Sequence, residues 1–277
     1  MKNLKLISLA IVVIAMIILL ACNEENTVNT ITSEKIIPTQ PCTNPISWLG
    51  ASHNSGVDYI YSSSTFNVSG ITLSDDNFND YVIELSYDYV QSDALLQDPN
   101  YSLQDHDDLV RPFLEEMTSI EGYRNYCSTQ FSTAANSLSS IQVSYINQMF
   151  NLVDEGSTMT VADIQAELDD IESEMCNDNM NTTSNFAWAC YTVFKSSFDR
   201  AVNLTNSNRK ENKDLSLQKW GWVEWTTVAV DYCTAAGCAA SAVQTGGVSL
   251  VVIGKATAAA SGTANLVANL IDKAIEE

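Results

Sequence analysis

The chain contains few basic residues. Its 13 lysines and arginines stand against 34 aspartates and glutamates, which gives a formal net charge of −21 at pH 7. Proteins bind nucleic acid through clustered Lys and Arg side chains that neutralise phosphates. Because so negative a chain repels a phosphate backbone, we expect no nucleic acid among its partners. The excess of acids instead favours solubility and repulsion between copies of the protein.

Histidine is scarce, and several metal-binding motifs are missing. The sequence has two histidines and no Cys-x-x-Cys spacing, whereas structural zinc sites need four Cys or His ligands. Asp80 and Ser86 replace the turn glycine and the bidentate Glu of an EF-hand loop. We therefore expect no cofactor and no metal. An irregular calcium site stays open at Asp75–Asp80 and at Asp105–Asp108. For the second segment the simpler interpretation is the acidic N-terminus of a helix.

An apolar run opens the chain. Two lysines precede the run from Leu6 to Leu20, which has about the length of the h-region of a signal peptide. The run ends in Leu-Leu-Ala-Cys22, which resembles the lipobox of bacterial lipoprotein precursors. That resemblance implies cleavage after residue 21 and a lipid on Cys22. A plain membrane anchor is the alternative, because a spanning helix needs roughly 17 or more apolar residues.

The next segment is consistent with lipid anchoring. Residues 22–45 are polar and hold three prolines, as expected of a tether between lipid and folded protein. With residues 1–21 removed, 11 basic residues would face 34 acidic ones, a charge of −23. Glu24 and Glu25 resemble a surface-export signal. We expect a lipid-anchored protein of the cell envelope, in the outer membrane on its periplasmic or surface face, with the membrane as its partner.

Seven cysteines are present, and a lipid on Cys22 would leave an even number. In an oxidising compartment an even number suggests disulfide pairing, with 15 possible connectivities for six cysteines. The sequence does not choose among them. The candidate disulfide cysteines are Cys42, Cys127, Cys176, Cys190, Cys233 and Cys238.

Apolar residues recur at helical spacing through residues 46–205. We expect a helical domain here, as part of an all-α helical bundle. Pro112 fits a helix only in its first turn, and Gly122 marks a break or a cap. The predicted helices run from about Asp75 to Pro99, from about Asp107 to Ile120, over 138–156, from a capping box at Thr160 and Asp163, and over 184–204.

The C-terminal part differs in composition. A polar linker is predicted at 206–219, and residues 220–277 begin with three tryptophans and are then rich in Ala, Gly, Ser and Thr. Small residues four apart allow close helix packing, so we expect a small-residue-rich helical hairpin with arms at 222–244 and 248–274. Asp231 and Lys255 interrupt the arms, which favours a hairpin packed on the helical domain. A membrane-inserting, bacteriocin-like hairpin is the alternative.

The only histidine with a plausible catalytic neighbour in the sequence is His53. It could act as a general base oriented by Asp58, because imidazole titrates near neutral pH. No Gly-x-Ser-x-Gly or other nucleophile motif accompanies it. The alternative interpretation of this segment is a pair of residues that cap or pack a helix.

Two short blocks carry a resemblance. His53, Asn54, Asp58 and Tyr59 form one, and the Trp-rich C-terminal segment with Trp222, Asp231 and Gly237 forms the other. Together they are similar to uncharacterised exported lipoproteins of Bacteroidota. The resemblance implies location and architecture and says nothing about chemistry.

Three functions remain open from the sequence. The first is a non-enzymatic envelope lipoprotein with a binding or structural role. The second is a membrane-perturbing factor that acts through residues 222–274. The third is a hydrolase that uses His53 and Asp58.

Overall fold

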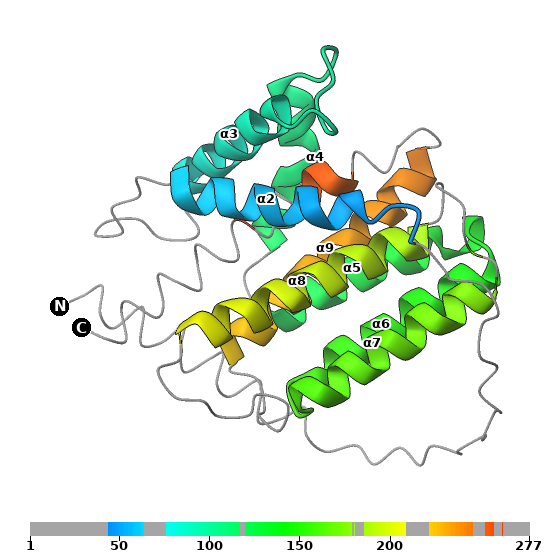
Figure 1. Ribbon diagram of the computed structural model, residues 1–277. Helices are drawn as coiled ribbons and strands as arrows, with labels where there is room; N and C mark the ends of the chain where they lie inside the picture. Colours follow the sequence, from blue (N-terminus) through cyan, green and yellow to red (C-terminus); the bar gives the residue numbers. More distant parts are fainter. Residues whose placement is uncertain are drawn as a thin grey trace. The chain divides into compact units, whose positions relative to one another are not determined.

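The computed structural model describes residues 44–63, 76–116, 120–178, 180, 186–208, 222–245, 253–257 and 262. All of them belong to one compact unit, Gln40–Glu277. Their secondary structure is helical, and no β-strand occurs within these ranges. The predicted all-α helical bundle is confirmed (Figure 1).

The helices follow one another with short connections where the structure describes them. A further helical turn covers residues 253–257. The elements are α2 (Trp48–Ser63), α3 (Asp76–Ser92), α4 (Leu103–Glu116), α5 (Ile120–Ala134), the 3₁₀ turn η1 (Ala135–Ser137), α6 (Ser140–Gly156), α7 (Val161–Asn177), α8 (Phe186–Asn208) and α9 (Trp222–Thr245).

Helix α9 forms the core of the bundle, where it packs most extensively on α5 and α8 (Figure 1). Almost every side chain described from Trp225 to Ala240 is buried. Three polar groups join α9 to its neighbours: Trp225 Nε1 donates to Val153 O at 3.1 Å, Tyr232 Oη donates to Ile146 O at 2.5 Å, and the hydroxyls of Tyr123 and Thr234 lie 2.5 Å apart. The first arm of the predicted hairpin is therefore a core helix.

Small residues allow the helices to approach α9 closely. A Cβ atom added at Gly237 would lie 2.8 Å from Phe113 Cε1, and one at Gly156 would lie 2.0 Å from Trp225 Cζ2. Both distances are shorter than a Cβ contact allows, so each glycine leaves room for an aromatic ring. The small-residue spacing read from the sequence thus corresponds to tight packing in a protein core.

The turn and most of the second arm of the predicted hairpin lie outside the described residues. Residues 253–257 and 262 of that arm are helical and buried. Gly254 packs against Leu49 and Leu96, and Gly262 against Ile60. This part of the second arm therefore lies against α2 and the connection from α3 to α4.

The capping box predicted for α7 is present, and α6 has an N-cap that was not predicted from the sequence. Ser139 accepts a hydrogen bond from Gln142 N, and Thr160 and Asp163 form a reciprocal capping box. Helix α7 buries its apolar stripe and exposes the acidic face opposite, including Glu167 and Asp170. That acidic face is a solvated helix surface.

Two local predictions were wrong. Pro112 lies in the second half of α4 rather than in its first turn. The helix tolerates it because Pro112 and Asp108, whose carbonyl loses its intrahelical donor, are both exposed, so water can solvate that carbonyl. Gly122 lies inside α5, a helix that the sequence reading did not predict.

The prediction of disulfide pairing is wrong for four of the six candidate cysteines. Cys127, Cys190, Cys233 and Cys238 are free thiols buried in the core. Each fills space as a small apolar residue, and burial raises the pKa of all four, to about 12 for Cys190. Cys176 differs, because it is disulfide-bonded.

The predicted signal peptide and nearly all of the predicted tether, with Cys22 and Cys42, lie outside the described residues, as does most of the linker at 206–219. Asn44, near the end of the predicted tether, already donates from Nδ2 to Thr192 Oγ1 of α8 at 2.8 Å. Helix α8 continues to Asn208, into the range predicted as linker.

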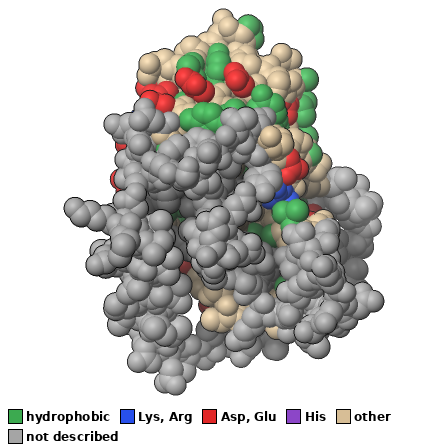
Figure 2. Space-filling view, turned by 90° about the vertical axis from the view of Figure 1, so that its left-hand side faces the viewer, with side chains coloured by type: hydrophobic (Ala, Val, Ile, Leu, Met, Phe, Trp, Pro, Cys, Tyr) green, Lys and Arg blue, Asp and Glu red, His purple; other side chains and the backbone are tan. Residues whose placement is uncertain are grey.

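None of the helices in the described ranges combines the length and apolarity that a membrane crossing requires. In Figure 2, acidic side chains lie among hydrophobic and other residues on the part of the surface that is coloured by type, and blue Lys or Arg atoms show at one place there. Most of the charged side chains on the described part of this face are therefore acidic.

Candidate functional site

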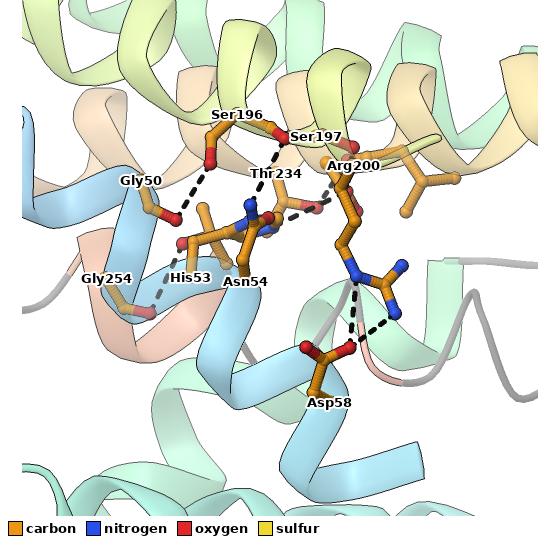
Figure 3. A network of polar contacts seen from close by, with 12 residues as sticks. Gly50, His53, Asn54, Asp58, Ser196, Ser197, Arg200, Thr234 and Gly254 are labelled. Carbon is orange, nitrogen blue, oxygen red and sulfur yellow. Dashed lines mark hydrogen bonds and ion pairs between the residues drawn. The ribbon is translucent and has the colours of Figure 1, made fainter. Parts of the chain in front are cut away.

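His53 lies in the middle of α2, with its side chain fully buried between α2, α8 and α9 (Figure 3). Its Nε2 is 3.4 Å from Asp231 Oδ2 on α9, and that carboxylate is also buried. Its Nδ1 is 3.1 Å from Oδ1 of Asn54. His53 is therefore part of a buried pair with Asp231 that joins α2 to α9, two helices that are far apart in the sequence.

The orientation of Asn54 shows which of its atoms faces His53. Asn54 Nδ2 donates to Ser196 O at 3.3 Å, so its Oδ1 is the atom that faces the imidazole. An amide oxygen and a carboxylate oxygen only accept hydrogen bonds. His53 therefore lies between two groups that both accept hydrogen bonds.

The Asp231 carboxylate lies at the centre of this network. Ser197 Oγ donates to the same Oδ2 atom that faces His53. Among the described residues, Oδ1 of Asp231 has no hydrogen-bond partner although it is buried. His53 of α2 and Ser197 of α8 thus both contact the same carboxylate oxygen of Asp231 on α9.

Close packing of α2 on α8 brings these groups together. Ser196 Oγ donates to Gly50 O at 2.9 Å, and a Cβ at position 50 would lie 2.8 Å from Ser196 Cβ. Gly50 is one turn before His53, so the absence of its side chain sets how near the histidine comes to α8 (Figure 3).

The structure does not bring the predicted pair His53 and Asp58 together. Asp58 is largely exposed and pairs with Arg200 of α8, with its Oδ1 2.7 Å from Arg200 Nη2. The acid that faces His53 is Asp231, for which the sequence predicted no catalytic role. In this network the carboxylate lies between the serine and the histidine, whereas a nucleophile–base arrangement requires the histidine in the middle.

A second buried network surrounds His106 in α4. Its Nε2 is 2.7 Å from Ser86 Oγ of α3, and its Nδ1 is 3.1 Å from Tyr101 Oη. Ser86 Oγ also donates to Ile83 O at 3.0 Å, so its oxygen accepts the proton of Nε2. Nδ1 then accepts from the Tyr101 hydroxyl. Burial, with the nearby charge of Lys255, lowers the pKa of His106 to about 4 and keeps the ring neutral at pH 7.

Lys255 completes this second network. Its side chain is buried, and its Nζ lies 3.4 Å from the centre of the Tyr101 ring. Burial lowers the pKa of Lys255, while the charges of Asp98 and Asp105 act in the opposite direction. From the sequence, Lys255 was predicted only to interrupt the second apolar arm.

The segment Asp105–Asp108 has a structural role. Asp105 accepts from Ser102 N at 2.8 Å, and Ser102 Oγ accepts from Asp105 N at 3.1 Å, so the two residues cap α4. Within the ranges that the structure describes, no group of three or more His, Cys, Asp or Glu side chains is placed to hold a metal ion.

Comparison with known proteins does not assign the site. No protein-family model, no curated protein and no solved structure matches the chain.

The buried ion pair generates a stability prediction. Asp231→Asn removes the carboxylate from a fully buried pair with His53, so we expect the free energy of unfolding to fall by about 3 kcal/mol or more. Asp58→Asn is the matched control, because it removes an exposed ion pair worth about 1 kcal/mol or less. Chemical denaturation followed by circular dichroism measures both, and equal losses in the two variants would contradict the assignment.

The neutral state of His106 generates a pH prediction. The folded protein holds its pKa at about 4, against 6.5 for an ordinary histidine. The stability that this group contributes is therefore complete above pH 6.5 and is lost as the pH falls towards 4, about 3 kcal/mol in total. We expect denaturation curves of His106→Gln to show a smaller loss over this interval than the parent. The same slope in both proteins would refute a buried neutral His106.

Proposed function

We propose that this protein is a lipid-anchored lipoprotein of the bacterial cell envelope, with a helical part that binds a partner or has a structural role. The observation that carries the proposal is the apolar run that ends at Leu-Leu-Ala-Cys22, with two lysines before it and a polar segment after it. A diacylglyceryl group and an acyl chain on Cys22 would together hold the mature protein on the membrane.

Further features of the sequence agree with this proposal. The charged groups on the surface are mostly acidic, which suits a protein that stays soluble outside the cytoplasm and does not bind nucleic acid. Glu24 and Glu25 after the lipid-bearing cysteine favour the outer membrane and its surface face. The similarity of the His53 and Trp222 blocks to exported Bacteroidota lipoproteins supports the same location.

A binding or structural role is favoured over hydrolysis by the places of the candidate catalytic groups. His53 is fully buried, and both of its ring nitrogens face groups that belong to the fold. Asp58, the acid proposed to orient it, instead forms an ion pair with Arg200. The hydrolase hypothesis therefore loses the arrangement on which it depended.

The membrane-perturbing alternative acts through the segment that begins with α9. Trp225, Tyr232 and Thr234 of this helix are bonded to α5 and α6, and its neighbouring side chains are buried. Insertion into a bilayer would require α9 to leave the core and lose these contacts. We therefore favour the interpretation in which residues 222–274 belong to the folded bundle.

The lipid anchor is tested by Cys22→Ala. Because the variant has no thiol to receive the lipid, we expect it to leave the membrane fraction, whereas the parent remains there after washes with salt and carbonate. Globomycin-sensitive processing of the parent gives a second measurement of the same step. Retention of the variant in the membrane fraction would contradict the anchor and favour a spanning segment.

The role of residues 222–274 is tested with the unlipidated protein and vesicles loaded with a self-quenching dye. We expect no leakage at neutral or mildly acidic pH, because burial keeps the helix in the bundle. A pore-forming peptide serves as the positive control. Leakage by the folded protein, accompanied by new protease cleavage within α9, would support the membrane-perturbing alternative.

A further inference from the structure

Cys176 is the disulfide-bonded cysteine among those that the structure describes. The other described cysteines are free thiols in the core: Cys127, Cys190, Cys233 and Cys238. Of the seven cysteines in the sequence, Cys22 and Cys42 are then the two that remain. On the proposed function, on which this step rests, the sulfur of Cys22 carries its lipid as a thioether and has no thiol to pair. Cys42 is the cysteine left in the chain for Cys176.

The contacts of α7 place Cys176 near the N-terminal turns of α8. Lys195 Nζ donates to Gln165 Oε1 at 3.4 Å, and Tyr191 Oη donates to Glu172 Oε2 at 3.0 Å. The two helices therefore run antiparallel, since a later residue of α7 meets an earlier residue of α8. Cys176 follows Glu172 by one more turn and packs, partly buried, against the main core. It thus lies at the height of the turn of α8 that precedes Tyr191.

The chain before α2 approaches the same end of α8. Its contacts with α8 advance in parallel, and Figure 3 shows the two later ones. They are Asn44 Nδ2 to Thr192 Oγ1 at 2.8 Å, Ser196 Oγ to Gly50 O at 2.9 Å, and Arg200 Nη2 to Asp58 Oδ1 at 2.7 Å. Followed backwards, this series leads from Asn44 towards the N-terminal turns of α8.

The two approaches converge at one height of α8. Tyr191, which meets α7, and Thr192, which meets Asn44, are adjacent residues on neighbouring faces of the helix. Cys42 lies outside the described residues, but it precedes Asn44 by two positions, which span at most about 7 Å. A disulfide needs Cα atoms about 4.4–6.8 Å apart. The chain before Asn44 is therefore long enough to reach the end of α7.

We infer that Cys42 and Cys176 form a disulfide that fixes the start of the folded part to the end of α7. An S–S bond forms between the two sulfurs as each thiol loses its proton. The two electrons and two protons pass to a disulfide-bearing oxidoreductase of the envelope, which becomes a dithiol.

In a lipid-anchored protein this bond decides where the anchor is attached to the fold. A pull on the lipid at Cys22 passes along the chain and reaches the cross-link at Cys42 before it reaches α2. The load then passes to α7 through a covalent bond, instead of acting on the hydrogen bond between Asn44 and Thr192. Helix α2, which holds His53 beside Asp231, is thereby protected from the anchor.

The test is a disulfide map of the full chain isolated from membranes. Free thiols are alkylated in denaturant without reductant, and the digested protein is analysed by mass spectrometry. We expect one linked pair of peptides, which contains Cys42 and Cys176, and alkylation of the four core cysteines. A non-reducing gel should show a monomer. Alkylated Cys176, a link from Cys176 to a core cysteine, or a linked dimer would overturn the inference.

The Cys22→Ala variant separates this inference from the lipid anchor. Its link between Cys42 and Cys176 should form unchanged, whether or not the variant leaves the membrane, because the partner thiol is still present. A link between Cys22 and Cys176 in the parent would refute both the pairing and the lipid. Release of the variant from the membrane, by contrast, reports on the anchor alone.

A thermal unfolding cycle in the Cys22→Ala background gives a second measurement. We expect Cys42→Ser to lower Tm by about 5 °C or more, because the lost cross-link closes a long loop. Adding Cys42→Ser to Cys176→Ser should lower Tm no further, since the bond is already absent. Dithiothreitol should lower Tm in the background protein and leave both single variants unchanged. Additive losses in the double variant would overturn the pairing.

Discussion

The close packing of α9 inside the bundle is the constraint on which the rest of the structure depends. Helices α5 and α8 make the most extensive contacts with it, and several buried alanine and cysteine residues of α9, together with Gly237, keep its surface small enough for this close approach. Small side chains bring backbones near one another and leave little space to repack. Aromatic residues from the neighbours then fill the remaining volume, as Phe113 does over Gly237.

The two buried polar networks are consequences of that packing. Asp231 points from α9 into the contact with α2 and α8, where a lone carboxylate would be costly, and His53 and Ser197 satisfy one of its oxygens. Lys255 lies on the next described turn of the chain and meets Tyr101. The two charged residues of the apolar C-terminal stretch thus each meet a group from the first half of the chain. These contacts fix which surfaces of α2 and α4 face inwards.

Local signals in the sequence predicted much of the fold. The capping box at Thr160 predicted where α7 begins, and the apolar stripe that follows predicted its buried face, because both effects act within one or two turns. Helix α5 was missed although Tyr123, Cys127 and Phe131 recur every four residues, since Gly122 and many polar residues between them outweighed the pattern. The cysteines were misread for a related reason: their even number suggested pairing, but burial as small apolar residues was the stronger tendency for four of them.

The candidate sites were less predictable because their partners are distant in sequence. His53 and Asp231 were each noted from the sequence, but nothing local indicates that α2 and α9 meet. Asp58, only five residues from His53, was the more obvious partner and proved to belong to an exposed pair. Asp231 also has a consequence for export. It is the tenth of 24 residues in a helix with few other charges, and an aspartate near the centre of such a segment opposes partition into lipid by about 3 kcal/mol. For a chain that is secreted as proposed, this carboxylate would help the translocation channel to pass the core helix onward instead of releasing it sideways into the bilayer.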